Sequence, residues 1–452
     1  MEYRIEHDSM GEVRVPADKL WGAQTQRSLE NFRIGGEKQP PELIQALVMV
    51  KKACAAANFA AGKLDAEHAQ AITEACGRLL AGGYEDAFPL MVWQTGSGTQ
   101  TNMNVNEVIA HLAAREGLAV HPNDHVNMSQ STNDAFPTAI HVAGCLLIEN
   151  ALLPALDHLR GTLLRLEEQN RSFIKVGRTH LQDATPVRFS QEISGWRAML
   201  DANREMLDAS LSHLRRLAIG GTAVGTGLNA PEGFDRLVCT ELHKMTGLAF
   251  EPDPNKFHAL ASKDALVFAH GAMKALAANL MKIANDVRWL ASGPRCGLGE
   301  IRIPENEPGS SIMPGKINPT QCEAVTMVAV QVMGNDAAVG FAASQGNFEL
   351  NVFMPVLGYD FLQSARLLAG AMESFDQNCV SGIVALPRRM EENLERSLML
   401  VTRLSPKIGY ENAARIAHEA YENGQSLREA ALVSGLLDAA ELDALLQPEQ
   451  MV

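Results

Sequence analysis

Four polar segments interrupt an otherwise aliphatic chain, and they hold most of the residues whose types suit acid–base chemistry on a small anion. Hydroxyls and amides recur in them, and each segment precedes a predicted helix. The N-terminus of a helix offers unpaired N–H groups and the positive end of the helix dipole. Several such ends converging on one point would therefore bind a small anion. The segments span residues 96–104, 129–134, 177–186 and 309–319.

His180 and Lys316 are the ionisable side chains of these segments that best suit such a site. An imidazole titrates near neutral pH, so His180 is the best acid–base candidate among the 13 histidines. Lys316 supplies a point charge for a carboxylate, and its loop is rich in glycine and proline, as in loops that close over a substrate. A structural histidine, a surface lysine and plain capped loops are the alternatives. Four such segments in one chain favour a site.

The composition excludes several other classes of protein. The chain has 452 residues with 39 Lys and Arg against 53 Asp and Glu, a net charge of −14, which argues against a nucleic-acid partner. The seven cysteines are scattered without a CxxC pair, which argues against zinc clusters, iron–sulfur clusters and a disulfide framework, so we expect reduced thiols. No run of 18 apolar residues and no targeting segment is visible, so we expect no membrane span and a cytoplasmic protein.

Long helices must position the polar segments. Hydrophobic residues make up 46% of the chain but aromatic residues only 5%, which favours helix over strand. From Ala269 to Leu290, apolar residues recur at alternating spacings of four and three, the seam of a left-handed helix bundle. Shorter helices are expected near 40–63 and 65–81, and few strands. The five long helical segments predicted are 134–169, 186–217, 262–292, 319–345 and 355–382.

We expect three domains: a mixed, mainly helical one over 1–133, the long-helix bundle over 134–384, and a small helical one over 385–452. The segments 262–292 and 319–345 are apolar on more than one face, so they must be buried on several sides. Homo-oligomerisation through these two helices is the preferred explanation, and burial by the other domains of the same chain is the alternative.

The fourth segment resembles the signature loop of the fumarase/aspartase superfamily. It reads GSSIMPGKINP over 309–319, and all four segments follow the order of that family over essentially the whole chain. Gly315 before Lys316, and the run PTQCEA over 319–324, are similar to the class II fumarases. The resemblance implies an all-α, three-domain protomer with a central bundle of five long helices. It also implies a homotetramer with a 20-helix core, whose active sites combine segments of three subunits.

The resemblance further implies a reaction, the reversible anti hydration of fumarate to (S)-malate through an aci-carboxylate intermediate and without a cofactor. Ser310 would take the C3 proton. His180, polarised by Glu323, would act through a water at the C2 hydroxyl. The dicarboxylate would be held by Ser97, Thr99, Ser131, Thr132, Asn133, Thr179, Ser311, Lys316 and Asn318.

A second, peripheral dicarboxylate site of the family would fall on His121, Asn123 and Asp124. Leu118 stands where the family often has a basic residue, and a capped turn is the alternative interpretation. For the activity, two alternatives remain: another lyase of the superfamily, such as aspartate ammonia-lyase, and a helical scaffold protein without catalysis. The presence of Ser310, His180 and Lys316 argues against a scaffold.

Overall fold

The computed structural model describes residues 2–114 and 118–452. The chain divides into two compact units. Unit 1 comprises residues 1–154, 203–277 and 328–369, and unit 2 comprises residues 155–202, 278–327 and 370–452. The boundaries fall within long helices, and the division predicted at 133 and 384 stays a prediction.

Unit 1 begins with an antiparallel hairpin of β1 (Tyr3–Asp8) and β2 (Gly11–Pro16). The predicted early helices are confirmed by α2 (Pro41–Ala60) and α3 (Ala66–Leu80), with Asp65 capping α3 through the His68 N–H. Small apolar residues fill α2, which is buried over most of its length. The remaining shorter helices of the unit are α1 (Ala23–Asn31), α4 (Thr99–Ala114), α5 (Thr132–Leu147), α8 (Phe234–Thr246) and α9 (Lys256–Ala261).

The five predicted long segments are helices. A π-helical turn at Ile148–Leu152 joins α5 to α6, so that one helix runs over 132–169. The predicted apolar seam is buried along α10, from Ala269 at 0% to Leu290 at 4% exposure. The long helices are α6 (Leu153–Gln169), α7 (Phe189–Leu214), α10 (Asp264–Leu290), α11 (Thr320–Ala343) and α12 (Met354–Asn378).

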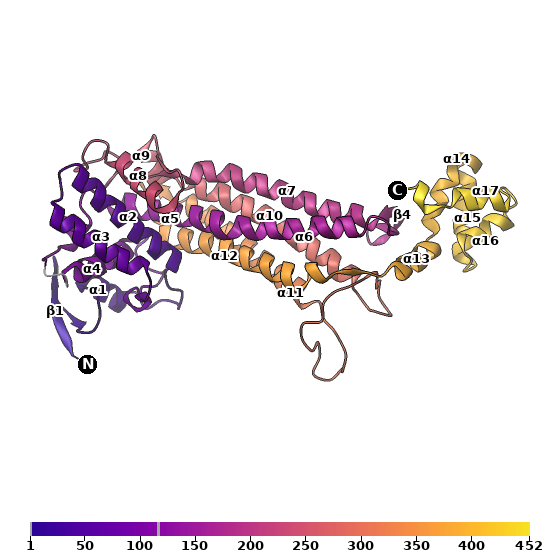
Figure 1. Cartoon of the computed structure of the whole chain (residues 1–452), viewed down its shortest axis with the longest axis horizontal. Coiled ribbons are helices and arrows are strands. Elements are labelled where there is room, and N and C mark those ends of the chain that lie inside the picture. The colour runs from indigo at the N-terminus through magenta and orange to yellow at the C-terminus, as the bar shows by residue number, and fades with distance from the viewer. Residues whose placement is uncertain (1, 115–117) are drawn as a thin grey trace. The chain divides into compact units, whose positions relative to one another are not determined.

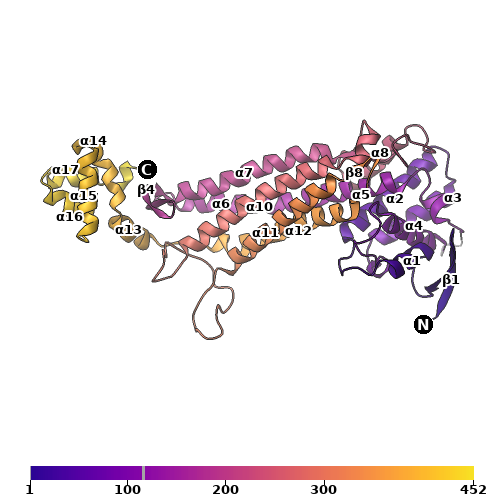
Figure 2. The same ribbon diagram turned by 180° about the vertical axis from the view of Figure 1, so that it is seen from behind.

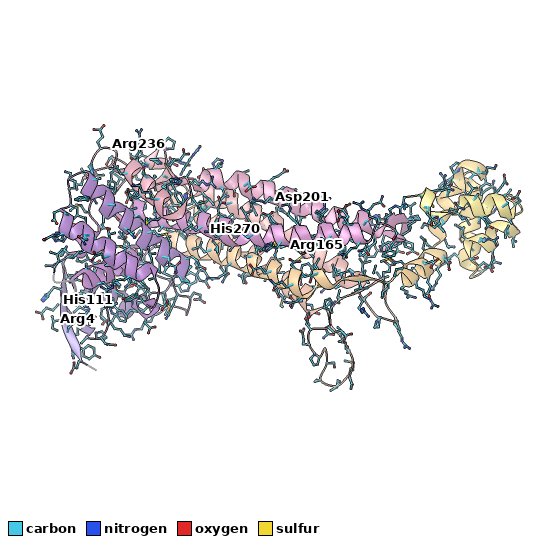
Figure 3. All side chains as sticks on the ribbon, in the orientation of Figure 1. Arg4, His111, Arg165, Asp201, Arg236 and His270 are labelled. Atoms are coloured by element: carbon cyan, nitrogen blue, oxygen red, sulfur yellow. The ribbon has the colours of Figure 1, made fainter. Side chains whose placement is uncertain are left out.

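Within unit 1, the parts of α10, α11 and α12 that belong to it lie side by side (Figures 1 and 2). His270 of α10 lies inside this bundle (Figure 3). Its Nε2 contacts Ser364 Oγ of α12 at 2.9 Å, and its Nδ1 contacts Asp336 Oδ1 of α11 at 3.1 Å. These polar contacts fix how the three aliphatic helices pack, because a buried imidazole must keep its partners.

Unit 2 contains one feature that differs from the sequence prediction. The sequence predicts a helix from residue 186, but β3 (Ile174–Thr179) and β4 (Gln182–Arg188) form a hairpin and α7 begins only at Phe189. Branched residues alternate along these strands, as at Ile174 and Val176, and this pattern suits a pleated, half-buried surface. Val176 packs into the same core as the C-terminal helices α13 (Pro387–Arg396), α14 (Ser405–Ile408), α15 (Tyr410–Glu422), α16 (Leu427–Val433) and α17 (Ala439–Leu445).

The described strands are short and form five two-stranded sheets. With helix over 62% of the chain, the predicted all-α class is confirmed. Besides the two hairpins above, the sheets pair β5 (Arg216–Leu217) with β6 (Glu251–Pro252), β7 (Ile301–Arg302) with β10 (Val384–Ala385), and β8 (Gly346–Asn347) with β9 (Leu350–Asn351).

Three helical stretches are long and apolar enough to cross a membrane by length and composition alone: α2, 132–169 and α11. The first two are largely buried inside the protein, at 67% and 61% of their most apolar windows, whereas α11 is buried over only 28% of its window. Met327, Val330 and Phe341 of α11 are 67%, 62% and 76% exposed. The predicted multi-sided apolar character of this helix is therefore present, and the chain leaves part of it uncovered.

The cysteines are reduced in the structure and differ sharply in exposure. Six of the seven are buried, and only Cys296 is exposed. Among the described residues, no group of three or more His, Cys, Asp or Glu side chains is arranged to hold a metal ion.

Candidate active site

In unit 1 the first two polar segments come together at the N-termini of α4 and α5. Ser131 caps α5, accepting the Asn133 N–H, and Asp134 completes a capping box. Asn102 Nδ2 of α4 donates to Thr132 Oγ1 of α5 at 2.9 Å, and Ser97 Oγ lies 2.7 Å from Thr99 Oγ1. The two helix N-termini thus present neighbouring hydroxyls, as the sequence predicts.

Two glycines allow this close approach. Gly98 has a φ of +77°, and a Cβ there would lie 2.6 Å from the ring of Phe136 on α5. Gly96 lies against the backbone of Val352, and its carbonyl accepts the Met354 N–H at 2.9 Å. Only glycine satisfies both the conformation of Gly98 and the space at the two positions.

A buried cation lies behind these hydroxyls. Lys51 of α2 is 0% exposed, and its Nζ donates to Asn127 Oδ1 and Gln130 Oε1, both at 2.9 Å. Asn127 Oδ1 also accepts from Asn102 Nδ2, which links the lysine to Thr132. Burial lowers the pKa of Lys51 to about 8. Sequence reasoning missed Lys51, although its position on the buried face of an apolar helix is a signal that it has a polar partner.

Asp134 fixes the second segment to the turn at 220–223. Its carboxylate accepts the N–H groups of Ser131, Gly220 and Thr222 at 2.8 to 2.9 Å. Burial nevertheless raises the pKa of Asp134 to about 6. Asn133 Nδ2 donates to Ala223 O at 2.7 Å, so one of its amide hydrogens is already engaged within the chain. These contacts orient the Ser131–Thr132–Asn133 run rigidly.

In unit 2 the predicted acid–base histidine occupies the tip of the β3–β4 hairpin. Thr179 pairs with Gln182, which leaves His180 and Leu181 as a two-residue turn with φ values of +57° and +59°. Such turns favour Asn-Gly, because other side chains in the left-handed region are strained. His180 lines a cavity of about 990 Å³ together with Lys175, Arg178, Asp183, Glu192 and Asn393. Strain that persists at a candidate catalytic residue points to a functional constraint.

The strain can be tested at Leu181, whose side chain is 67% exposed and loses little burial when removed. We expect Leu181→Gly to keep or raise the melting temperature, with a gain of up to about 1 kcal/mol in the free energy of unfolding. Leu164→Gly is the matched control: this leucine is 45% exposed within α6, and glycine should lower the stability there. Equal losses in the two variants would contradict strain at the turn.

The fourth segment forms a loop closed by its own hydrogen bonds. The Gly309 N–H donates to Lys316 O at 2.9 Å, and Asn318 Nδ2 donates to Gly309 O at 2.6 Å. Lys316 Nζ lies 2.8 Å from Asn318 Oδ1. Ser311 and Lys316 are exposed on this loop. The loop thereby holds its two proposed carboxylate-binding side chains, Lys316 and Asn318, next to each other.

Ser310 has the most informative geometry of the loop. Its Oγ accepts the N–H groups of Ile312 at 3.3 Å and Met313 at 3.1 Å. Two N–H donors on one hydroxyl oxygen favour negative charge on that oxygen, the condition a serine needs to act as a base.

Some predicted partners are not in contact within one chain. Glu323 lies exposed in the first turn of α11, and in the described part of the chain it forms no hydrogen bond or ion pair with His180. At the predicted second site, His121 Nδ1 accepts the N–H groups of Asn123 and Asp124, at 3.3 and 3.1 Å. The side chain of His121 therefore caps its own turn, the alternative interpretation for this site.

Comparisons with known proteins agree over the full length. A family profile described as Lyase matches residues 11–334, and one described as Fumarase C C-terminus matches residues 400–452. Proteins named fumarate hydratase class II from Bacillus subtilis (strain 168) and Helicobacter pylori (strain J99) are each 59% identical, over 100% of this chain and 99% of theirs.

The solved structures agree as well. A class II fumarase from Schistosoma mansoni superposes with a TM-score of 0.97 at 41% identity, over 100% of this chain and 99% of that one. A fumarate lyase:delta crystallin protein from Brucella melitensis superposes with a TM-score of 0.90 at 40% identity, over 98% and 100%. Because the Lyase profile matches residues 11–334 and a class II fumarate hydratase is 59% identical over the whole of this chain, the chain belongs to the class II fumarate hydratase family of lyases.

Proposed function

We propose that this enzyme catalyses the reversible anti hydration of fumarate to (S)-malate, with Ser310 as the base. The observation that carries the proposal is the pair of N–H groups donated to Ser310 Oγ on a loop that also presents Lys316 and Asn318. This loop belongs to a chain that is 59% identical to proteins named fumarate hydratase class II.

Binding of the dicarboxylate comes first. Hydroxyls at the N-termini of α4 and α5 hold one carboxylate, where helix dipoles and the buried charge of Lys51 favour an anion. The loop and the hairpin supply the other donors. Fixing both carboxylates sets the orientation of C2 and C3, so that only the anti geometry reacts. The proposed donors are Ser97, Thr99, Ser131, Thr132, Asn133, Thr179, Ser311, Lys316 and Asn318.

The difficult step is removal of the C3 proton of malate, because the product is a dianionic aci-carboxylate. Ser310 acts as its alkoxide, formed when the hydroxyl proton is released to solvent. Its Oγ takes the C3 proton and becomes the neutral hydroxyl, while Lys316 and Asn318 stabilise the charge that develops on the substrate carboxylate. His180, polarised by Glu323, then donates a proton through a water to the C2 hydroxyl, which leaves as a water molecule. The reverse sequence hydrates fumarate.

The assembly follows from the same proposal. We infer a homotetramer with composite active sites, supported by the uncovered apolar side chains of α11 and by the lack of contact between His180 and Glu323 in the described part of one chain. We also propose that the chain has three domains, with boundaries near 133 and 384. The enzyme is proposed to be cytoplasmic and to work without a cofactor. A second dicarboxylate at His121, Asn123 and Asp124 would have to displace the two backbone N–H groups that His121 Nδ1 accepts.

An ultraviolet assay of fumarate tests the reaction. With malate as substrate and a chelator present, we expect fumarate to accumulate at an undiminished rate. With aspartate as substrate, we expect no fumarate above background. Faster formation of fumarate from aspartate than from malate would replace the hydratase assignment by the ammonia-lyase alternative.

A further inference from the structure

Glu300 is a buried carboxylate at the point where several elements of unit 2 meet. It is 0% exposed and directly precedes β7. Its N–H donates to Leu290 O, at the end of α10, at 2.8 Å, and its carbonyl accepts the Leu386 N–H at 2.9 Å. The backbone of Glu300 therefore fixes the chain ten residues before Ser310, at the base of the segment that leads into the Ser310 loop.

The side chain of Glu300 reaches the histidine hairpin. Its carboxylate accepts a two-pronged pair of hydrogen bonds from Arg178, with Nη2 at 2.6 Å and Nη1 at 3.0 Å. Asn393 Nδ2 of α13 donates to Oε1 at 3.0 Å, and Lys175 Nζ lies 3.4 Å from Oε2. Two-pronged arginine–carboxylate pairs restrict orientation as well as distance.

Arg178 stands two residues before His180 on β3, and the register of the hairpin is irregular between Val176 and Arg178. The turn at His180 is strained, so contacts outside the turn must hold it in place. The Arg178–Glu300 pair is such a contact, with two hydrogen bonds of 2.6 and 3.0 Å. Arg178, Lys175 and Asn393 line the same cavity as His180.

We propose that Glu300 is a positioning residue for the hydration reaction: through Arg178 it sets the orientation of the His180 turn, and through its backbone it anchors the base of the Ser310 loop. The inference rests on the proposed function. Glu300 does not contact the reacting atoms, and its effect is exerted through the two segments that do. A displacement of about 1 Å in such segments costs on the order of 10²-fold in rate.

The charge state supports this role. Burial works to raise the pKa of Glu300, but the hydrogen bonds from Arg178 and the charges of Lys175 and Arg178 outweigh it and hold the pKa below its usual value. The carboxylate is therefore ionised at neutral pH, where it pairs with the Arg178 guanidinium. A purely structural role, the balancing of buried charge, makes a different prediction and must be separated by experiment.

The decisive comparison is between Glu300→Gln and the double variant Arg178→Met/Glu300→Gln, with Glu167→Gln as the matched control. Glu167 of the same unit also pairs with an arginine, at 2.9 Å from Arg197 Nε, and it is not among the residues that line the His180 cavity. We expect Glu300→Gln to lower kcat/KM for malate on the order of 10²-fold and to lower the melting temperature. We expect Glu167→Gln to stay within about 3-fold of the native rate. The double variant removes the partly buried charge of Arg178 together with the buried charge of Glu300, so it should regain the melting temperature but not the rate.

Recovery of the rate together with stability in the double variant would overturn positioning and leave only charge balance. A near-native rate in Glu300→Gln would overturn it as well. Hydrogen exchange of the amides of residues 178–182 gives a readout independent of activity: it should be faster in Glu300→Gln and in the double variant, and unchanged in Glu167→Gln. An inactive native enzyme would refute the proposed function. The hydrogen-exchange rates would then test the positioning role by themselves, and unchanged exchange in Glu300→Gln would refute that role.

Discussion

Replacing Ser310 by alanine should lower kcat for malate dehydration on the order of 10³-fold, within the range that one general acid–base group supplies. The structure gives the reason. Ser310 Oγ accepts two N–H groups of its own loop, so the loop stabilises the oxyanion that must form when serine acts as a base. Alanine removes the oxygen and keeps the loop closure between Gly309 and Lys316, which uses backbone groups only. The fumarate assay at saturating malate measures the loss.

The control for this prediction is Ser381→Ala. Ser381 is an exposed serine of the same unit, and its hydroxyl donates to the Gln377 carbonyl at 3.0 Å. We expect native activity in this variant, and unchanged mass by light scattering and unchanged circular dichroism in both variants. Near-normal turnover in Ser310→Ala would show that Ser310 is not the base that takes the C3 proton. Loss of assembly in that variant would assign Ser310 a structural role instead.

Gly96→Ala should be the most damaging of the conservative substitutions in unit 1. A Cβ at this position would lie 1.4 Å from the carbonyl oxygen of Val352, and backbone cannot move aside as a side chain does. The hydrogen bond from the Met354 N–H to Gly96 O would be lost at the same time. We expect a loss of about 3 kcal/mol in the free energy of unfolding, the upper range for overpacking. The urea midpoint measures this loss, and KM for malate should rise because Ser97 and Thr99 are displaced.

Gly77→Ala is the matched control for that substitution. Gly77 lies inside α3, and nothing lies within 4 Å of a Cβ placed there. Alanine should therefore raise the free energy of unfolding by roughly 0.5–1 kcal/mol, as expected in a helix interior. If Gly96→Ala also left the urea midpoint unchanged, the close approach of the two backbone segments would be refuted.

The helices were predictable because their physics is local and repeated. Aliphatic residues at spacings of four and three placed all five long helices to within a few residues, and the seam from Ala269 to Leu290 is buried as expected. The β3–β4 hairpin was not predicted, because its polar tip and the proline at 186 resemble a capped helix start. The pairing of Thr179 with Gln182 across the turn, rather than the helix or strand propensity of single residues, makes this segment a hairpin.

The types of residue in the candidate site could be predicted from the sequence, but the buried residues that hold them in place could not. The hydroxyl residues, His180 and Lys316 can be picked out from the sequence because they are polar residues clustered in an otherwise aliphatic chain. Glu300 and Lys51 did not, because their roles depend on partners far along the chain, Arg178 for the first and Asn127 for the second. No spacing rule connects residues 122 or 76 positions apart. Only the packed structure shows that these buried charges have partners.

The uneven exposure of the cysteines makes the enzyme suitable for site-specific labelling without mutagenesis. Burial raises the pKa of Cys76, Cys145 and Cys239 to about 12, so these thiols stay protonated and inert toward alkylating dyes. Cys296 is exposed and lies four residues before Glu300, on the segment that leads into the Ser310 loop. A fluorophore attached there would report, from a natural position, how that segment moves as the dicarboxylate enters and leaves.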